Sequence, residues 1–209
     1  TGMNHRGLIV GIVALAAVGG STNAVVHLLA IAGRLGIDLS LDDFDRSGAG
    51  VPLLVDLQPA GTHLMEDFHR AGGLLAVLRE VQDLLDPAAI TVTGHPLVDH
   101  LRDARIWDES VIRPRAQPLL ADAGIAVLRG NLAPDGAVIK PSAASEKLLN
   151  HKGRALVFDS QPEMLAAMAD ESLDCDENTV LVLRNAGPVG APGMPEWGNL
   201  PIPKKLLKA

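Results

Sequence analysis

Residues 187–209, GPVGAPGMPEWGNLPIPKKLLKA, limit the possible folds of this chain more than any other segment. They contain four glycines and five prolines. Such a segment cannot run as a helix or a central strand, because proline lacks the backbone donor and glycine loses much conformational entropy on ordering. We expect a shaped loop that carries one carboxylate, Glu196, beside Trp197 and Gly198. Composition alone fits an exposed linker as well as a ligand-binding or metal-binding loop.

The composition indicates a globular protein with an aliphatic core. A length of 209 residues, 47% of them hydrophobic, is enough for one large or two small domains. Because only 2% of the residues are aromatic, the core must consist mainly of Val, Ile, Leu and Ala. The scarcity of aromatic side chains and the net charge of −7 argue against a nucleic-acid partner. The only basic run, Lys204, Lys205 and Lys208, is interpreted as a solvated tail.

The chain has a single cysteine, Cys175, which excludes an internal disulfide and any multi-thiolate zinc or iron-sulfur site made by this chain alone. One cysteine fits a reducing, cytoplasmic compartment. Its acidic neighbours disfavour the thiolate, so we interpret it as a spectator. The apolar run at residues 8–18 is too short to span a bilayer and predicts a buried helix of a soluble protein with no membrane partner.

A glycine-rich turn precedes the next predicted helix, in residues 19–36, GGSTNAVVHLLAIAGRLG. Ser21 and Thr22 can cap this helix, and Gly36 ends it. Backbone N–H groups at such a helix start attract a substrate carboxylate or phosphate, although simple capping is the commoner role of this pattern. The candidate substrate-binding residues are Gly20, Ser21, Thr22 and Asn23.

The rest of the first half predicts helices with one or two short strands. Ser40 caps a helix, and residues 51–59 form a buried strand that Pro59 ends. Residues 62–85 form two helices broken at Gly72 and Gly73. Residues 89–101 predict a strand, a turn at Gly94 and a helix.

The second half is predicted to be rich in strands. Four short ones are expected at residues 125–130, 136–140, 154–158 and 179–185. A turn lies at residues 133–136, and the capping box of Ser160 and Glu163 opens one helix. The fold class is therefore α/β, with a boundary near residues 108–122 that separates a domain of residues 1–110 from one of residues 111–209.

Several segments together resemble the dihydroxy-acid and phosphogluconate dehydratase family (IlvD/Edd). They are VGGSTNAVVHLLAIA, DDFDR, VPLLVDLQPAG, LMEDFHRAGG, TVTG, LRGNLAPDGAVIK and GAPGMPEWG, and they follow the family's order over nearly the whole chain. KPSAASEKLLNHKGRALVF and GMPEWGNLPIPKKLL are most similar to the sugar-acid branch, whose substrates include L-arabinonate and D-xylonate.

The resemblance implies a hydro-lyase that converts a 2,3-dihydroxy acid into a 2-keto-3-deoxy acid with an iron-sulfur cluster and Mg²⁺. By this resemblance, Glu196 corresponds to a ligand of the divalent metal, and Pro192, Gly193, Pro195 and Gly198 would fix its direction. The resemblance also implies that residues 1–110 end an α/β domain, that residues 111–209 are part of a barrel-like C-terminal domain, and that the protein is a homodimer or homotetramer.

The same resemblance places the cluster cysteines, the other metal ligands and a metal-bridging lysine before Thr1, and a base serine after Ala209. It therefore implies an internal piece of a longer enzyme, with no catalytic residue in this chain and no dehydratase activity of the chain alone. Two alternatives stay open: a dihydroxy-acid dehydratase of branched-chain amino-acid biosynthesis, and a non-catalytic module that binds an anion at residues 19–23 or assembles with a partner.

Overall fold

A computed structural model describes residues 4–122, 124–186 and 200–208. The chain forms two compact units, residues 1–144 and residues 145–209. In the described residues, no helix is long and apolar enough to cross a membrane.

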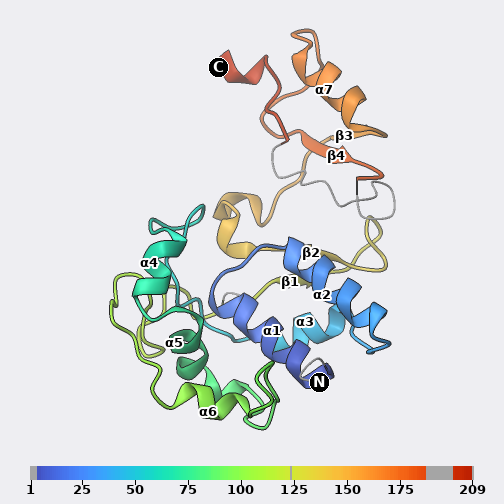
Figure 1. Ribbon diagram of the computed structural model, residues 1–209. Helices are drawn as coiled ribbons and strands as arrows, with labels where there is room; N and C mark the ends of the chain where they lie inside the picture. Colours follow the sequence, from blue (N-terminus) through green and yellow to red (C-terminus); the bar gives the residue numbers. More distant parts are fainter. Residues whose placement is uncertain (1–3, 123, 187–199, 209) are drawn as a thin grey trace. The chain divides into compact units, whose positions relative to one another are not determined.

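The first unit contains six helices among its described residues (Figure 1). They are α1 (His5–Ala17), α2 (Asn23–Arg34), α3 (Leu41–Gly48), α4 (Met65–Arg70), α5 (Gly73–Glu80) and α6 (Leu97–Leu101). The sequence predicted all six. The break between α4 and α5 is confirmed at Gly72 and Gly73, which have φ angles of +125° and +62° that favour glycine.

Helix α1 lies between α5 on one side and α2 and α3 on the other (Figure 1). Because its side chains are apolar on all faces, α1 contributes to two hydrophobic clusters at once. Val13 packs with Leu54, Val77 and Ile112 in the larger cluster. Ile12 packs with Val25, Phe44 and Ile125 in the smaller one. This confirms that residues 8–18 are a buried helix.

The strands β1 (Ala126–Leu128) and β2 (Ala137–Ile139) form an antiparallel hairpin, with Val127 opposite Val138. The predicted turn between them is confirmed, since the N–H of Gly136 donates to the carbonyl of Ala133 at 3.1 Å. Val127 and Val138 pack against the smaller cluster on α1, α2 and α3. The hairpin thus belongs to the first compact unit, and the domain boundary expected near residues 108–122 stays a prediction.

The segment expected to be a strand at residues 51–59 is extended but forms only isolated bridges. Leu53 pairs with Leu120, and Val55 pairs with Ile112. The partner stretch between residues 112 and 120 contains Pro114 and Pro118, which lack the N–H that a continuous ladder needs. The strand expected near residue 90 is likewise reduced to one bridge, between Ile90 and Pro96.

The second unit is a small βαβ arrangement. Strands β3 (Ala155–Phe158) and β4 (Val180–Leu183) pair in parallel, and α7 (Gln161–Ala169) lies between them in sequence. The hydroxyl oxygen of Ser160 accepts a hydrogen bond from the N–H of Glu163 at 3.4 Å, as the capping pattern predicted. The core holds Phe158, Met164 and Met168.

Short 3-10 turns complete the described residues, at Gln82–Leu84, Pro141–Ala143, Glu146–Leu148 and Leu206–Lys208. The mixed α/β class is confirmed. The four strands that the structure describes form two two-stranded sheets, without a closed barrel. Cys175 is a buried free thiol, and its role as a spectator stays a prediction.

Candidate functional site

The GGSTN turn, residues 19–23, links α1 to α2. Gly19 has a φ of +64°, and the N–H of Gly20 donates to the carbonyl of Leu15 at 2.8 Å. The hydroxyl oxygen of Ser21 accepts from the N–H of Asn23 at 3.2 Å, whereas the side chain of Thr22 makes no capping bond. One of the two predicted capping residues therefore caps the helix start.

The far end of α2 also follows the prediction. Gly36 has a φ of +65°. The N–H of Ile37 donates to Ala32 at 2.9 Å, and the N–H of Gly36 donates to Gly33 at 3.3 Å. These two bonds form the Schellman motif, which ends a helix at a left-handed glycine.

Lys140 follows strand β2 and reaches the GGSTN turn. Its Nζ donates a hydrogen bond to the carbonyl oxygen of Gly19. The side chain is half-buried, and burial lowers the pKa of Lys140 below its ordinary value, because a charged ammonium is less stable away from water. The contact joins segments from opposite halves of the chain within the first unit.

A hollow of about 250 Å³ opens at this contact. Its polar lining includes Gly19, Asp56, Lys140 and Ser142. Aliphatic side chains make up most of the remaining wall: Val18, Leu53, Val55, Leu57, Leu119 and Leu120. The hollow is therefore an apolar depression with a cation, a carboxylate and a hydroxyl in its wall.

Ser142 lies in the 3-10 turn that follows Lys140. Its Oγ is buried and has no hydrogen-bond partner, and it is the one buried side-chain oxygen or nitrogen of the described residues in that condition. An unpaired buried hydroxyl costs about 1–3 kcal/mol. A water or a ligand in the hollow would satisfy it.

Asp56 is held as a carboxylate. Its Oδ2 accepts from the hydroxyl of Thr62 at 2.6 Å, and its Oδ1 accepts from the N–H of Thr62 at 3.0 Å. The hydrogen bond from the Thr62 side chain is the main cause that lowers the pKa of Asp56. The backbone bond and the nearby His63 and Arg113 add to this effect against the opposing effect of burial. The fixed carboxylate faces the same hollow as Lys140.

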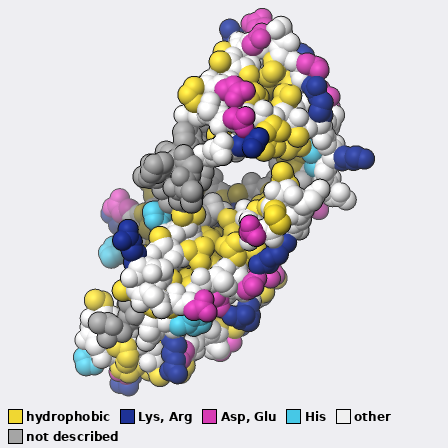
Figure 2. All heavy atoms as spheres, turned by 90° about the vertical axis from the view of Figure 1, so that its right-hand side faces the viewer, with side chains coloured by type: hydrophobic (Ala, Val, Ile, Leu, Met, Phe, Trp, Pro, Cys, Tyr) yellow, Lys and Arg dark blue, Asp and Glu magenta, His cyan; other side chains and the backbone are white. Residues whose placement is uncertain are grey.

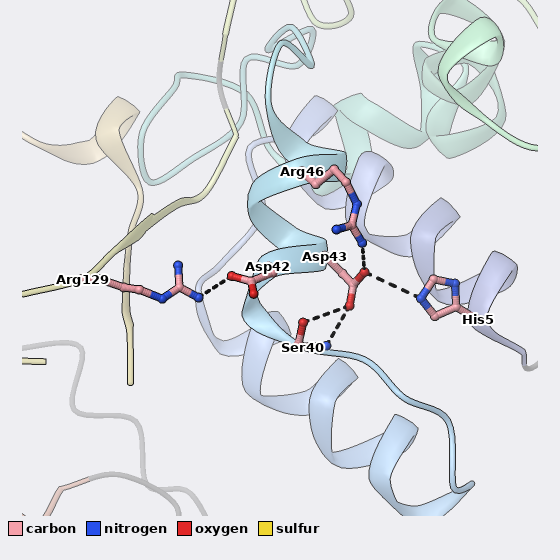
Figure 3. A network of polar contacts seen from close by, with 6 residues as sticks. All are labelled: His5, Ser40, Asp42, Asp43, Arg46 and Arg129. Atoms are coloured by element: carbon pink, nitrogen blue, oxygen red, sulfur yellow. Dashed lines mark hydrogen bonds and ion pairs between the residues drawn. The ribbon is translucent and has the colours of Figure 1, made fainter. Parts of the chain in front are cut away.

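A second polar network fixes α3, which packs on α1 and β1 (Figure 3). Asp43, only 6% exposed, accepts hydrogen bonds from the N–H of Ser40 at 2.9 Å and from its hydroxyl at 3.1 Å. Arg46 pairs with the other carboxylate oxygen, and His5 of α1 lies 3.7 Å from it. Burial alone would raise the pKa of Asp43. The bonds from Ser40 and the charge of Arg46 outweigh it, so the pKa is lowered. The network confirms the predicted cap at Ser40.

The site residues predicted from the sequence belong to the GGSTN turn and to the loop around Glu196. In the turn, Gly19 lines the hollow, but the four predicted substrate-binding residues that follow it do not. Those residues, Gly20, Ser21, Thr22 and Asn23, stay a prediction. Glu196 and the loop residues around it lie outside the described residues.

The sequence reasoning missed the two polar side chains at positions 140 and 142 as site residues. The signal for them was present in the segment GAVIKPSA, where a lysine and a serine directly follow an apolar strand. Asp56 was also missed, because it was interpreted only as part of a buried strand. Their meeting point depends on tertiary packing that no local pattern contains.

The described residues do not bring together a site for a metal ion or a cluster. No group of three or more His, Cys, Asp or Glu side chains among them is arranged to hold a metal. The single thiol, Cys175, is buried in the second unit. The hollow near Gly19 offers one carboxylate only, which is too few oxygen ligands for tight Mg²⁺ binding.

Comparison with known families identifies the chain. Residues 3–100 match the family model described as dihydroxy-acid/6-phosphogluconate dehydratase N-terminal, and residues 110–209 match the corresponding C-terminal model. The chain therefore belongs to the dihydroxy-acid/6-phosphogluconate dehydratase family. The family resemblance read from the sequence is confirmed.

Curated relatives give the degree of similarity. The chain is 55% identical, over 92% of its length, to an L-arabinonate dehydratase of Rhizobium leguminosarum bv. trifolii. It is 50% identical over 95% of its length to a 6-deoxy-6-sulfo-D-gluconate dehydratase of Pseudomonas putida, and 44% identical over 86% to a dihydroxy-acid dehydratase of Clostridium novyi. It spans about a third of the length of these relatives, 34%, 35% and 32% respectively.

Proposed function

We propose that the protein carrying this chain is a hydro-lyase that dehydrates a sugar acid, an aldonate such as L-arabinonate or D-xylonate, to the 2-keto-3-deoxy acid. The observation that carries the proposal is the gradient of identity, 55% to the L-arabinonate dehydratase against 44% to the dihydroxy-acid dehydratase. Dihydroxy-acid dehydration is the alternative within the same family. An anion-binding or assembly module without activity is the alternative outside it.

The reaction removes a proton from C2 and hydroxide from C3, which gives an enol and releases one water. The enol then takes a proton at C3 and becomes the ketone. The C3 hydroxyl is a poor leaving group and the C2 proton is weakly acidic, so the reaction needs both a Lewis acid and stabilisation of the enolate. An iron-sulfur cluster and Mg²⁺ supply that chemistry in our proposal.

The proposal assigns these cofactors to residues other than the described ones, because the described residues offer no fitting donor set. Within this chain, Glu196 is the proposed Mg²⁺ ligand, since a hard carboxylate oxygen suits that ion. A consequence is that the 209 residues alone would turn over no aldonate.

The setting proposed for the protein is cytoplasmic and homo-oligomeric, with a small acid as its partner and no nucleic acid. The net charge of −7 supports the last point. On the face drawn in Figure 2, basic and acidic side chains are interspersed over the described residues. Such a surface does not resemble the clustered basic patch that phosphate backbones attract.

A substrate panel tests the proposal. The product of the complete gene would be purified anaerobically, assayed for iron and Mg²⁺, and offered L-arabinonate, D-xylonate, D-gluconate and 2,3-dihydroxyisovalerate. We expect a keto acid from an aldonate at a kcat/KM at least tenfold above that for 2,3-dihydroxyisovalerate. The reverse order would favour the dihydroxy-acid alternative, and no turnover of any acid by the loaded protein would favour the non-catalytic module.

A further inference from the structure

We propose that the hollow beside Gly19 is a carboxylate-binding pocket, in which Lys140 and Ser142 hold the acid group of a small hydroxylated monoacid. The proposal deepens the proposed function, because an aldonate is such an acid. It assigns binding roles to two side chains outside the turn that the sequence singled out. It rests on the cavity, on the state of its polar groups and on the shape of its wall.

The ammonium of Lys140 has N–H donors that are available to a ligand. It carries three N–H donors, and one of them is used by the carbonyl of Gly19. Within the described residues, Lys140 forms no ion pair, and neither carboxylate oxygen of Asp56 lies within 4.0 Å of it. A half-buried cation without a paired anion attracts a ligand carboxylate more strongly than an exposed lysine does, because the effective dielectric constant is lower.

Ser142 supplies the second donor. Its buried Oγ has no partner, and the residue lies two positions after Lys140 in the same turn. A carboxylate has two oxygens and can accept from an ammonium and a hydroxyl at the same time. Binding an acid would therefore satisfy a polar group that the protein alone leaves unpaired.

The wall of the hollow sets the size and the kind of acid. A volume of about 250 Å³ lies below the roughly 300–1,000 Å³ typical of pockets for drug-sized ligands, so the site suits a smaller molecule. Aliphatic side chains such as Leu53, Leu119 and Leu120 exclude water from one side. Asp56, fixed as a carboxylate by Thr62, repels any acid group brought near it and can accept from ligand hydroxyls, so the single acid group would lie at Lys140 and the hydroxyls at Asp56. The pocket therefore favours a hydroxylated monoacid over a diacid.

A purely structural role for Lys140 is the competing explanation. In that case the lysine only ties the end of β2 to the GGSTN turn, and its removal would loosen the turn without a direct effect on an acid. The two explanations differ in what a ligand does to the unmodified protein. A bound acid protects the ammonium from chemical modification only when it contacts it.

The first measurement is ligand protection in the complete, unmutated protein. 3-Deoxy-L-arabinonate is the probe, because it lacks the hydroxyl that leaves and cannot be dehydrated. We expect saturating probe to slow acetylation of Lys140 at least fivefold, as followed by mass spectrometry of the peptides. Acetylation of the control Lys147, on an exposed turn, should not change. Equal rates for Lys140 with and without the probe would overturn the proposal.

The second measurement is calorimetric binding of the same probe to variants. Lys140→Met and Ser142→Ala should weaken binding, by about tenfold or more and by severalfold respectively, as expected for lost hydrogen bonds to a charged group. Lys140→Arg should bind better than Lys140→Met, and the control Lys147→Met should bind as the unmodified protein does. Unchanged binding to Lys140→Met would contradict the proposal.

Neutral and inorganic ligands separate the carboxylate from other sources of affinity. L-Arabinitol has the hydroxyls without the acid and should bind at least tenfold more weakly than the probe, whereas equal binding would overturn the proposal. Inorganic phosphate should compete only weakly. If it displaced the probe completely at equal concentration, the pocket would be a phosphate site instead.

The outcomes distinguish this proposal from the proposed function. Turnover of L-arabinonate with no protection of Lys140 would leave the function standing and remove the pocket. Protection of Lys140 by the probe in a fully loaded protein that dehydrates no aldonate would leave the pocket standing and remove the function.

Discussion

The ammonium of Lys140 donates a hydrogen bond to the carbonyl oxygen of Gly19, 121 positions earlier in the chain. The contact brings together GGSTN and GAVIK, which belong to two of the segments through which the chain resembles its family. It also places a cation at the edge of a hollow that contains an unpaired hydroxyl.

Gly19→Ala should destabilise the first unit by about 1–3 kcal/mol. The φ of +64° is strained for alanine, and a Cβ there would lie 2.7 Å from Cδ1 of Leu53. Gly33→Ala is the matched control, because Gly33 lies in α2 with no atom near the added methyl, and helical alanine is favoured over glycine. Urea unfolding measures both. A Gly19→Ala variant as stable as the control would show that the turn differs from the one described.

Asp43→Asn should cost about 1–2 kcal/mol at pH 7, because the amide cannot match the charge that faces Arg46 or accept equally well from Ser40. Asp42→Asn is the control on the same helix turn. Asp42 pairs with Arg129 at the surface (Figure 3), where such pairs contribute about 0–1 kcal/mol. Chemical denaturation compares the two variants. Equal losses would contradict the buried role of Asp43.

The contribution of Asp43 to the free energy of unfolding should depend on pH. Its folded pKa lies below the value of 3.8 for the free side chain, so the stabilisation is present above about pH 4 and is lost as the pH falls through the folded pKa. The difference in unfolding free energy between the unmodified protein and Asp43→Asn should therefore shrink below pH 4. A difference that grows on acidification would refute the direction of the shift.

Ile112→Ala should destabilise the first unit by about 2–5 kcal/mol, because Ile112 is 0% exposed in the larger hydrophobic cluster and its truncation leaves a cavity. Val92→Ala is the control, since Val92 is fully exposed and should change the stability by less than about 0.5 kcal/mol. Thermal and urea unfolding measure both. A small loss for Ile112→Ala would mean that the chain from residue 111 onward does not pack on Val55.

Lys140 should titrate below an ordinary lysine. Burial lowers its pKa from 10.5, so the rate of its acetylation should rise with pH around a midpoint below that value. Peptide-resolved labelling between pH 7 and 11 measures the midpoint. A midpoint at or above 10.5 would show that the side chain is solvated and does not line an apolar hollow.

Local patterns in the sequence predicted much of the fold. The cap at Ser160, the all-apolar run of α1, the left-handed Gly36 and the short apolar runs of β1 to β4 each have a short-range cause. Such signals act within a few residues and need no tertiary context.

The remainder depends on contacts between distant residues. Residues 51–59 have the composition of a strand, yet their partners near Pro114 and Pro118 limit them to isolated bridges. The grouping of β1 and β2 with α3 depends on the packing of Val127 and Val138 around Phe44. No local sequence pattern predicts this packing. The pocket residues Lys140 and Ser142 were missed for the same reason.

The most direct test of the proposed chemistry is the origin of the hydrogen that C3 gains, followed in heavy water. The complete, cofactor-loaded protein would be incubated with L-arabinonate in D₂O, and the product examined by NMR. Dehydration through an enol predicts 2-keto-3-deoxy-L-arabinonate with one solvent deuterium at C3. Recovery of unchanged L-arabinonate, or of a keto acid that retains the C3 hydroxyl, would contradict the account.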